Sequence, residues 1–190
     1  MIRSVIVIAF LLAVAGCSET TGSITPTPSV MKPLGYAFAP PAFYTFCDEQ
    51  PRLCSTDGDE AAMTMTAQRS AELKAVNEQV NRGFRQRDDK PGLDGDRWEL
   101  PTKAGGGDCE DLAIMKKAEL LKRGWPASTL LLTVGTLRGA GHTVLTVRTS
   151  DGDLVLDNVT DAIKPWSKTP YTFYARQKPN AGGGAEWTRI

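Results

Sequence analysis

The chain has 190 residues, enough for one domain of ordinary size, and 41% of them are hydrophobic, so a core can form. Lysine and arginine total 22 and balance 22 acidic residues, and the charges are dispersed, which excludes a charge-driven nucleic-acid partner. The chain holds four cysteines and one histidine, His142.

The first residues have the pattern of an export signal. Arg3 supplies a charged start, residues 5–14 are apolar, and small residues come just before Cys17. This ending resembles a bacterial lipobox and predicts a signal peptide at 1–16 with lipidation of Cys17; a plain signal peptide is the alternative. The apolar run is too short to span a membrane comfortably, so we expect an exported, periplasmic protein held to a bacterial membrane by a lipid anchor.

Residues 17–41 are rich in Thr, Ser and Pro and predict a tether without a core, which leaves the folded domain at 42–190. Cys47 and Cys54 bracket a short polar segment with a proline, and in an oxidising compartment we expect them to form a disulfide. Cys109 is then left over, as either a packed core thiol or a reactive one. The glycines before it and the acids beside it fit a core position poorly.

Two helices are expected next. Apolar residues at three- and four-residue steps predict a helix over residues 66–85 that packs against a second one. The second helix starts near Asp108 and stops at Gly124. Asp108 is its expected N-cap, with Asp111 in a capping-box arrangement. Apolar residues surround most of its circumference, so we expect this helix to be central and largely buried.

Strand-like runs follow at residues 129–134, 142–147 and 154–156. They are separated by a turn at 138–141 and by the hairpin signal Ser150-Asp151-Gly152-Asp153. A helix followed by antiparallel strands predicts an α+β domain. Aromatic residues near the C-terminus provide enough apolar surface to pack against an edge of the sheet.

The candidate nucleophile is Cys109, which follows Gly105-Gly106-Gly107-Asp108 at the expected helix start. Free N–H groups and the helix dipole favour a thiolate there, and the Cys109 N–H can face a developing oxyanion. A phosphate cradle is the competing use of a glycine run, but no Gly-Lys-Ser/Thr follows. His142 is the only imidazole that can deprotonate this thiol, so the pair predicts thiol catalysis on an acyl substrate.

The carboxylate that would orient His142 is left open by the strand pattern. With Asp151-Gly152 at the centre of a two-residue turn, Asp157 falls opposite Thr146 and about 13 Å along the strand from His142. A longer loop or a bulge would be needed to bring Asp157 alongside. Asp161 falls opposite His142 and is the reserve.

Acidic residues surround the candidate nucleophile. Asp108, Glu110 and Asp111 should raise the pKa of the Cys109 thiol, because they disfavour a second negative charge. A calcium ion held by their hard carboxylate oxygens would offset this effect. The simpler alternative is that acids in a first helical turn complement the helix dipole.

Several segments resemble the bacterial transglutaminase-like cysteine proteinases. The most specific are Gly106-Gly107-Asp108-Cys109-Glu110-Asp111, His142-Thr143-Val144-Leu145 and Leu154-Val155-Leu156-Asp157-Asn158. The upstream signatures are Leu73-x-x-Val76-Asn77-x-x-Val80-Asn81 and Trp98-x-x-Pro101, and those of the tail are Pro165-Trp166 and Tyr171. The similarity runs from about Cys47 to Trp187.

The resemblance implies a papain-like or transglutaminase-like α+β fold. The catalytic cysteine would lie at the N-terminus of a central helix, packed on an antiparallel sheet that carries the histidine and the aspartate. Cys109 would be the nucleophile, His142 the base and Asp157, rather than Asp161, the orienter. The implied function is that of a periplasmic cysteine endopeptidase acting on a protein substrate, such as a surface adhesin.

The same resemblance implies calcium on Asp108 and Glu110 and no organic cofactor. Two alternatives remain: an acyltransferase or cell-wall amidase with the same triad, and a non-enzymatic binding module on the same fold. An intact Cys, His and Asp set argues against the binding module, which has no need of all three. The chain is short for the adhesin-releasing members of the family, so a thiol hydrolase is better supported than adhesin cleavage.

Overall fold

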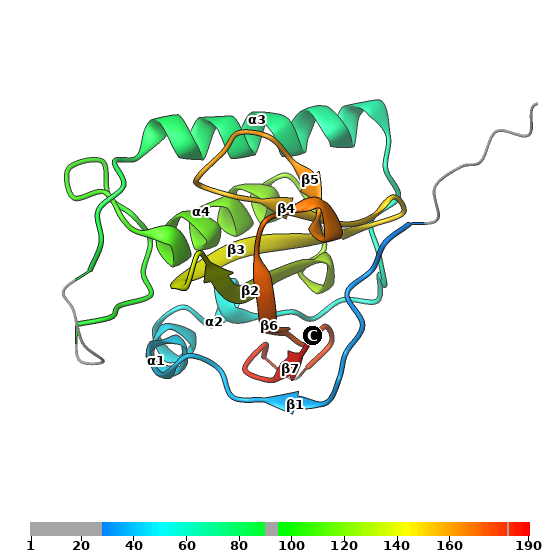
Figure 1. The fold of residues 1–190 in the computed structure, drawn as a ribbon. Helices are drawn as coiled ribbons and strands as arrows, with labels where there is room; N and C mark the ends of the chain where they lie inside the picture. Colours follow the sequence, from blue (N-terminus) through cyan, green and yellow to red (C-terminus); the bar gives the residue numbers. More distant parts are fainter. Residues whose placement is uncertain (1–27, 90–94, 182) are drawn as a thin grey trace, which may run out of the picture.

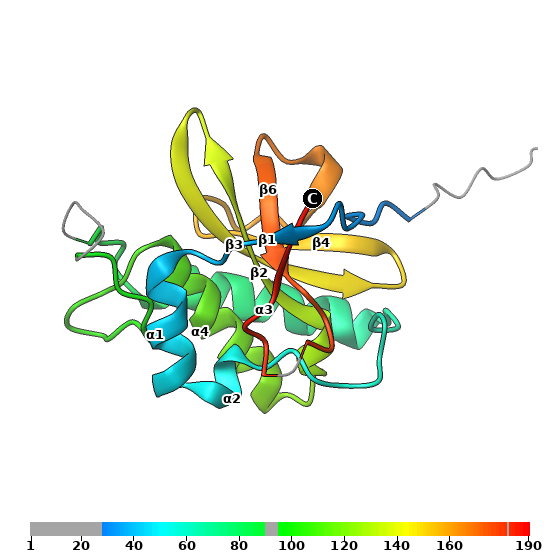
Figure 2. The same ribbon diagram turned by 90° about the horizontal axis from the view of Figure 1, so that it is seen from below.

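An antiparallel sheet with helices on one side forms the core of the computed structural model, which describes residues 28–89, 95–181 and 183–190 (Figures 1 and 2). The strand order of this 7-stranded sheet is β1-β7-β6-β2-β3-β4-β5. Its strands are β1 (Tyr36–Ala37), β2 (Leu130–Leu137), β3 (Ala140–Thr149), β4 (Gly152–Leu156), β5 (Lys164–Pro165), β6 (Thr172–Gln177) and β7 (Trp187–Arg189). The implied α+β class is confirmed.

The helices are α1 (Pro41–Glu49), α2 (Pro51–Cys54), α3 (Ala67–Gly83) and α4 (Cys109–Lys122), with short 3-10 turns at Ala127–Thr129 and Trp166–Lys168. Figure 1 shows α3 running alongside α4, which lies between α3 and the strands. The Thr66 hydroxyl caps α3 by accepting from the Arg69 N–H at 3.1 Å. Helix α4 ends before Gly124, whose φ of 77° favours a glycine. Both predicted helices are therefore confirmed.

Of the C-terminal aromatic residues, Trp187 enters the core, whereas Tyr174 is exposed. Trp187 of β7 packs edge-to-face on Phe43 of α1, with ring centroids 5.0 Å apart, and Trp98 packs on the same phenylalanine at 5.3 Å. Cys47 and Cys54 form the expected disulfide, which joins α1 to α2. Helix α1 and strand β7, which are far apart in the sequence, therefore pack against each other in the core.

The expected tether boundary at residue 41 is wrong. Ser29 bridges Gly152 of β4, and the Met31 N–H donates to the Asp153 carboxylate at 2.8 Å. Arg176 of β6 donates to the same carboxylate at 2.7 Å. Because these contacts tie Ser29 and Met31 to β4 and to the buried Asp153, residues 29–41 belong to the folded domain. The predicted signal peptide and Cys17 lie outside the described residues.

None of the helices in the described part of the chain is long and apolar enough to cross a membrane.

Replacement of Asp153 by Asn should destabilise the domain strongly. Asp153 and Arg176 are each only 2% exposed at their side chains, and Asp153→Asn would leave a buried guanidinium without its counter-charge. We expect the free energy of unfolding to fall by about 3 kcal/mol or more, measured by urea denaturation. Asp151→Asn, at an exposed position in the same hairpin, is the matched control. Equal stability of the two variants would contradict the role of the buried pair.

Candidate active site

Cys109 and His142 line one cavity of about 710 Å³ between the start of α4 and the sheet. Acidic residues form one wall, among them Asp89 and Asp96, and the exposed apolar side chains of Phe38, Val159 and Tyr174 form another. Asp157 is buried behind His142. The structure therefore brings the three residues expected to form the triad to one side of the sheet.

The sulfur of Cys109 is held between α4 and β3. It accepts a hydrogen bond from the backbone N–H of Thr143 at 3.3 Å, and its thiol donates to Glu110 Oε2 at 3.1 Å. Burial raises the pKa of this thiol, and the charge of Glu110 raises it further. Among the described residues no hydrogen bond joins the Cys109 sulfur to the imidazole of His142. The sulfur is hydrogen-bonded instead to the backbone N–H of the next residue, Thr143.

The imidazole of His142 is tied to Asp157. Nε2 lies 2.9 Å from Asp157 Oδ1, and the two side chains are 9% and 3% exposed. Because a ring nitrogen that donates to a carboxylate carries the proton, Nδ1 is the nitrogen left to accept one. The geometry thus leaves His142 able to act as a base toward the cavity.

The register of β3 and β4 explains how Asp157 reaches His142 and corrects the expected turn. Thr149 pairs with Gly152, so the two-residue turn is Ser150–Asp151, one residue earlier than expected. When this register is extended by one residue, Asp157 falls opposite Val144, two positions and about 7 Å along the strand from His142. Diagonal neighbours on one face are within reach of long side chains, so neither a bulge nor a longer loop is needed.

Asp157 is supported from several sides. Burial alone would raise the pKa of its carboxyl group, but hydrogen bonds from His142, the Tyr171 hydroxyl and the Val159 N–H lower it below its ordinary value. The acid that would orient His142 is therefore kept ionised. Tyr171 was expected only as part of a family signature, and its contact with Asp157 comes from the fold.

The reserve orienter, Asp161, lies elsewhere. It accepts hydrogen bonds from Asn81 at 2.9 Å and from Arg82 at 3.1 Å, both on α3. Asn81 also donates to the backbone carbonyl of Asp157 at 3.0 Å, and Asn77 donates to the carbonyls of residues 160 and 161. These two asparagines hold the loop that carries Asp157. Their spacing of one helical turn was the only sequence signal of this role.

The expected N-cap contact of Asp108 is absent, and Asp111 forms no capping box with it. Asp108 occupies the N-cap position of α4, but no side-chain hydrogen bond caps the helix. Instead its Oδ2 accepts from the Asp89 N–H at 3.3 Å, while its buried Oδ1 has no partner in the described structure. Asp111 accepts from the Glu99 N–H at 2.8 Å. Both carboxylates therefore contact the loop that precedes α4.

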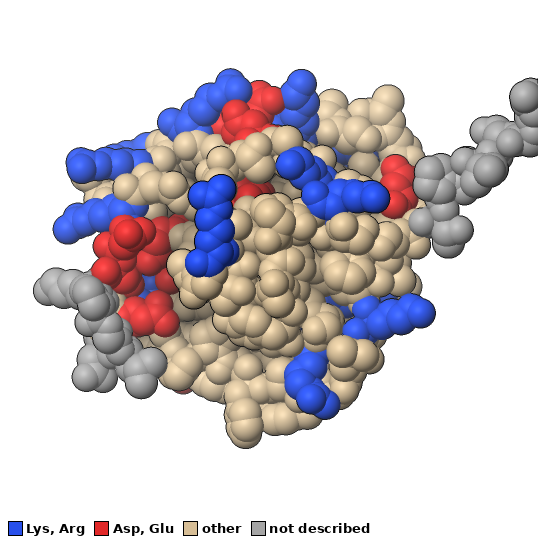
Figure 3. Space-filling view, viewed as in Figure 1, with Lys and Arg blue, Asp and Glu red and all other residues tan. Residues whose placement is uncertain are grey.

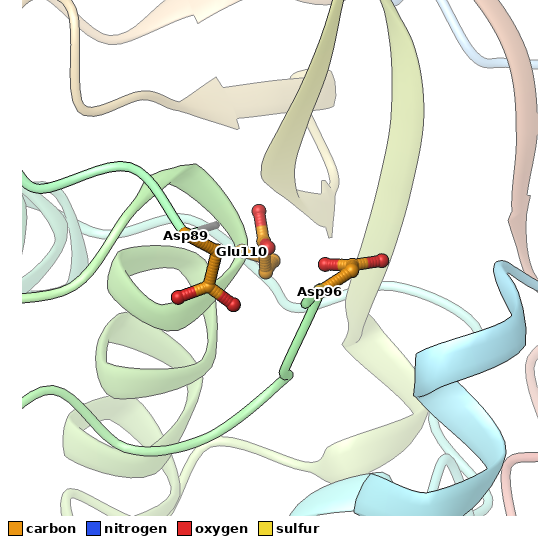
Figure 4. Close-up of side chains that lie close together, drawn as sticks. All are labelled: Asp89, Asp96 and Glu110. Carbon is orange, nitrogen blue, oxygen red and sulfur yellow. The ribbon is translucent and has the colours of Figure 1, made fainter. Parts of the chain in front are cut away.

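The structure groups three acids that could hold a cation: Glu110 together with Asp89 and Asp96, whose nearest ligand oxygens all lie within 4.8 Å of one another (Figure 4). Asp108 lies beside them, and Figure 3 shows acidic side chains gathered at the end of the molecule where α4 begins. Burial, followed by the charge of Asp108, raises the pKa of Glu110 to about 9. Burial and the neighbouring acids raise the pKa of Asp111 to about 7.

Of the two acids expected to bind calcium, Glu110 belongs to this group and Asp108 lies at its border. Asp89 and Asp96 were missed, because they lie 21 and 14 residues before Glu110 in a loop whose course the sequence does not predict.

Comparison with known proteins places the chain. The model of the family described as bacterial transglutaminase-like cysteine proteinase matches residues 34–190. Comparison with curated proteins gave no match. Calcium-bound LapG of Legionella pneumophila is similar at 28% identity and a TM-score of 0.49, over 56% of this chain and 64% of LapG. EGTA-treated LapG of Legionella pneumophila is similar at 26% identity and a TM-score of 0.48, over 56% of this chain and 62% of LapG. The chain thus spans less than two thirds of LapG. The family match covers most of the length of the present chain, which therefore belongs to the bacterial transglutaminase-like cysteine proteinases.

Proposed function

We propose that the protein is a cysteine endopeptidase with Cys109 as nucleophile, His142 as base and Asp157 as orienter. One observation carries this proposal: His142 is bound through Nε2 to a buried carboxylate, while the next residue, Thr143, holds the Cys109 sulfur. The base and the nucleophile therefore lie side by side in one cavity, and the base has a free nitrogen.

The chemistry follows from these contacts. Nδ1 of His142 takes the thiol proton, and the sulfur attacks the carbonyl carbon of a peptide bond to form a thioester after the amine leaves. The Cys109 N–H, at the start of α4, donates to the oxyanion of the tetrahedral intermediate. The protonated imidazole, stabilised by Asp157, returns the proton to the departing amine. It then activates the water that hydrolyses the thioester.

The substrate that the cavity fits best is an exposed protein segment. The cavity is open, and it combines an acidic wall with an apolar one, so it can accept a chain in extended form. A surface adhesin is the substrate that the family resemblance suggests. The expected acyltransferase and amidase alternatives use the same three residues, and no contact in the described structure favours them.

Removal of the nucleophile should abolish cleavage. Cys109→Ala should produce no new protein termini in a periplasmic extract, and the wild-type protein should lose this activity after iodoacetamide labels Cys109. Asp157→Asn should lower the rate about 100-fold or more, because the protonated imidazole loses its counter-charge. The readout is mass spectrometry of labelled N-termini.

The matched control is Asp151→Asn, at an exposed position in the same hairpin, which should cleave like the wild type. Retention of full cleavage by Cys109→Ala would refute the proposal.

We further propose that calcium binds at Glu110, Asp89 and Asp96, with Asp108 beside them. The residues present fit such an ion: hard oxygen ligands converge, and one buried carboxylate oxygen of Asp108 has no partner. LapG has been solved with calcium bound, but for this chain the proposal rests on its own carboxylates. When bound, the ion would supply positive charge beside Cys109 and offset the acids that raise the pKa of its thiol.

Calcium should stabilise the protein and change its pH dependence. Without the ion, the raised pKa of Glu110 means that the folded chain keeps a proton that the unfolded chain releases. In EGTA, therefore, the free energy of unfolding should fall as the pH rises from 4.5, the ordinary pKa of the group, toward about 9. At a calcium concentration 100 times the Kd, we expect about 2.7 kcal/mol of added stability.

Thermal melting with calcium or EGTA between pH 5 and 9 measures both effects. Asp96→Asn should weaken the stabilisation by calcium, whereas Asp59→Asn, at an exposed position outside the cavity, should not. No change in the melting temperature of the wild-type protein with calcium would rule out the site.

We propose that the protein is anchored in the periplasm through a lipid on Cys17. The sequence before Cys17 supports this proposal, because a charged start, an apolar run and small residues precede it. The intact mass of the mature protein tests it. A diacylglycerol-sized addition is expected on a chain that starts at Cys17, and Cys17→Ser should release the protein from the membrane fraction. A mature chain that starts elsewhere and carries no lipid would disprove the anchor.

A further inference from the structure

Tyr171 contacts both members of the histidine–aspartate pair. Its hydroxyl donates to Asp157 Oδ2, the carboxylate oxygen that His142 does not use. Its ring lies against the imidazole, with centroids 5.0 Å apart and planes inclined by 31°. Phe173 packs on the outer side of Tyr171 at 5.6 Å. Tyr171 thus contacts the Asp157 carboxylate through its hydroxyl and the His142 imidazole through its ring.

The sheet brings Tyr171 to this place. Strand β2 separates β3 from β6, and Gly135 of β2 pairs with His142 on one side and with Phe173 on the other. Partners two strand spacings apart are separated by about 9–10 Å, too far for direct contact when a side chain stands between them. Gly135 has no side chain, and a Cβ at this position would lie 2.7 Å from the Thr172 carbonyl oxygen. The glycine therefore lets β6 approach and leaves room for the two rings to meet.

Tyr171 occupies Oδ2 of Asp157 beside a second cavity. This cavity, of about 300 Å³, is lined by Asp157 and Tyr171 together with Arg138 and Lys164. The buried Lys116 of α4 also interacts by charge with Asp157. Without the Tyr171 hydroxyl, water from this second cavity could take its place on Oδ2, and the carboxylate would be free to turn.

We propose that Tyr171 is a positioning residue, which fixes the Asp157 carboxylate so that Oδ1 faces Nε2 and holds the His142 ring with Nδ1 toward Cys109. This inference rests on the proposed triad and deepens it. Tyr171 is not among the residues that line the cavity shared by Cys109 and Glu110, and it contacts Asp157 and His142 directly, so we expect its effect to pass through that pair. A hydrogen bond to an ionised carboxylate is among the stronger ones in a protein, so its loss should be measurable.

The test uses the rate at which iodoacetamide alkylates Cys109, which needs no identified substrate. In the full-length protein with calcium, Tyr171→Phe should slow alkylation about tenfold, the equivalent of one hydrogen bond to a charged group. Tyr44→Phe, at an exposed position on α1, is the matched control and should react like the wild type. Melting temperatures show whether each variant is folded.

A double-mutant cycle separates positioning from general destabilisation. If Tyr171 acts through the carboxylate, the effect of Tyr171→Phe should shrink to less than twofold in an Asp157→Asn background, because the two changes affect one contact. The chain has a single histidine, so NMR can also follow the His142 Nε2 proton. It should exchange with solvent faster in Tyr171→Phe than in Tyr44→Phe.

Equal alkylation rates for Tyr171→Phe and the wild type, or additive effects in the cycle, would overturn the positioning role and leave the triad standing. If Asp157→Asn by itself leaves the alkylation rate unchanged, the proposed orienter and the role of Tyr171 fall together. The two failures are thus distinguishable in one series of variants.

Discussion

The register of the β3–β4 hairpin is the constraint on which the site depends. With Thr149 paired to Gly152, Asp157 ends two residues from His142 on the same face of the sheet. A shift of one residue would turn the Asp157 side chain to the opposite face. The same hairpin is held at its far end by Asp153, whose carboxylate binds Arg176 and the Met31 N–H. The N-terminal segment therefore contributes to a geometry formed far from it in the sequence.

A second constraint is the conflict between the nucleophile and its acidic surroundings. A helix N-terminus favours a thiolate, but burial and Glu110 raise the pKa of the Cys109 thiol. The acids lie close together, and burial, followed by the charge of Asp108, raises the pKa of Glu110 to about 9. A cation bound at the proposed site would resolve this conflict, because it would lower the electrostatic cost of both the carboxylates and the thiolate. Metal binding and the reactivity of Cys109 would then be coupled by direct charge interaction.

Several predictions from local sequence were confirmed. The apolar steps of α3, the glycine after α4, and the short disulfide loop each depend on residues within a few turns of one another. Two local predictions were wrong, the N-cap contact of Asp108 and the hairpin turn at Asp151-Gly152. Prediction also failed where partners are distant. Asp89 and Asp96 join Glu110 only because a loop folds back on α4. Met31 belongs to the domain through contacts with β4 and β6, because its N–H donates to Asp153 and its carbonyl accepts from Arg176.

The sequence by itself indicated the candidate chemistry: a thiol at a glycine-led helix start, one imidazole, and a choice between two carboxylates. These features follow from residue type and short-range spacing, which can be read directly from the sequence. Only the tertiary structure decided which carboxylate meets His142, that Tyr171 supports it, and which acids converge on Glu110. The physical reason is that strand register and loop course are set by packing across the whole sheet, where a displacement of one residue exchanges every partner and alters no local pattern.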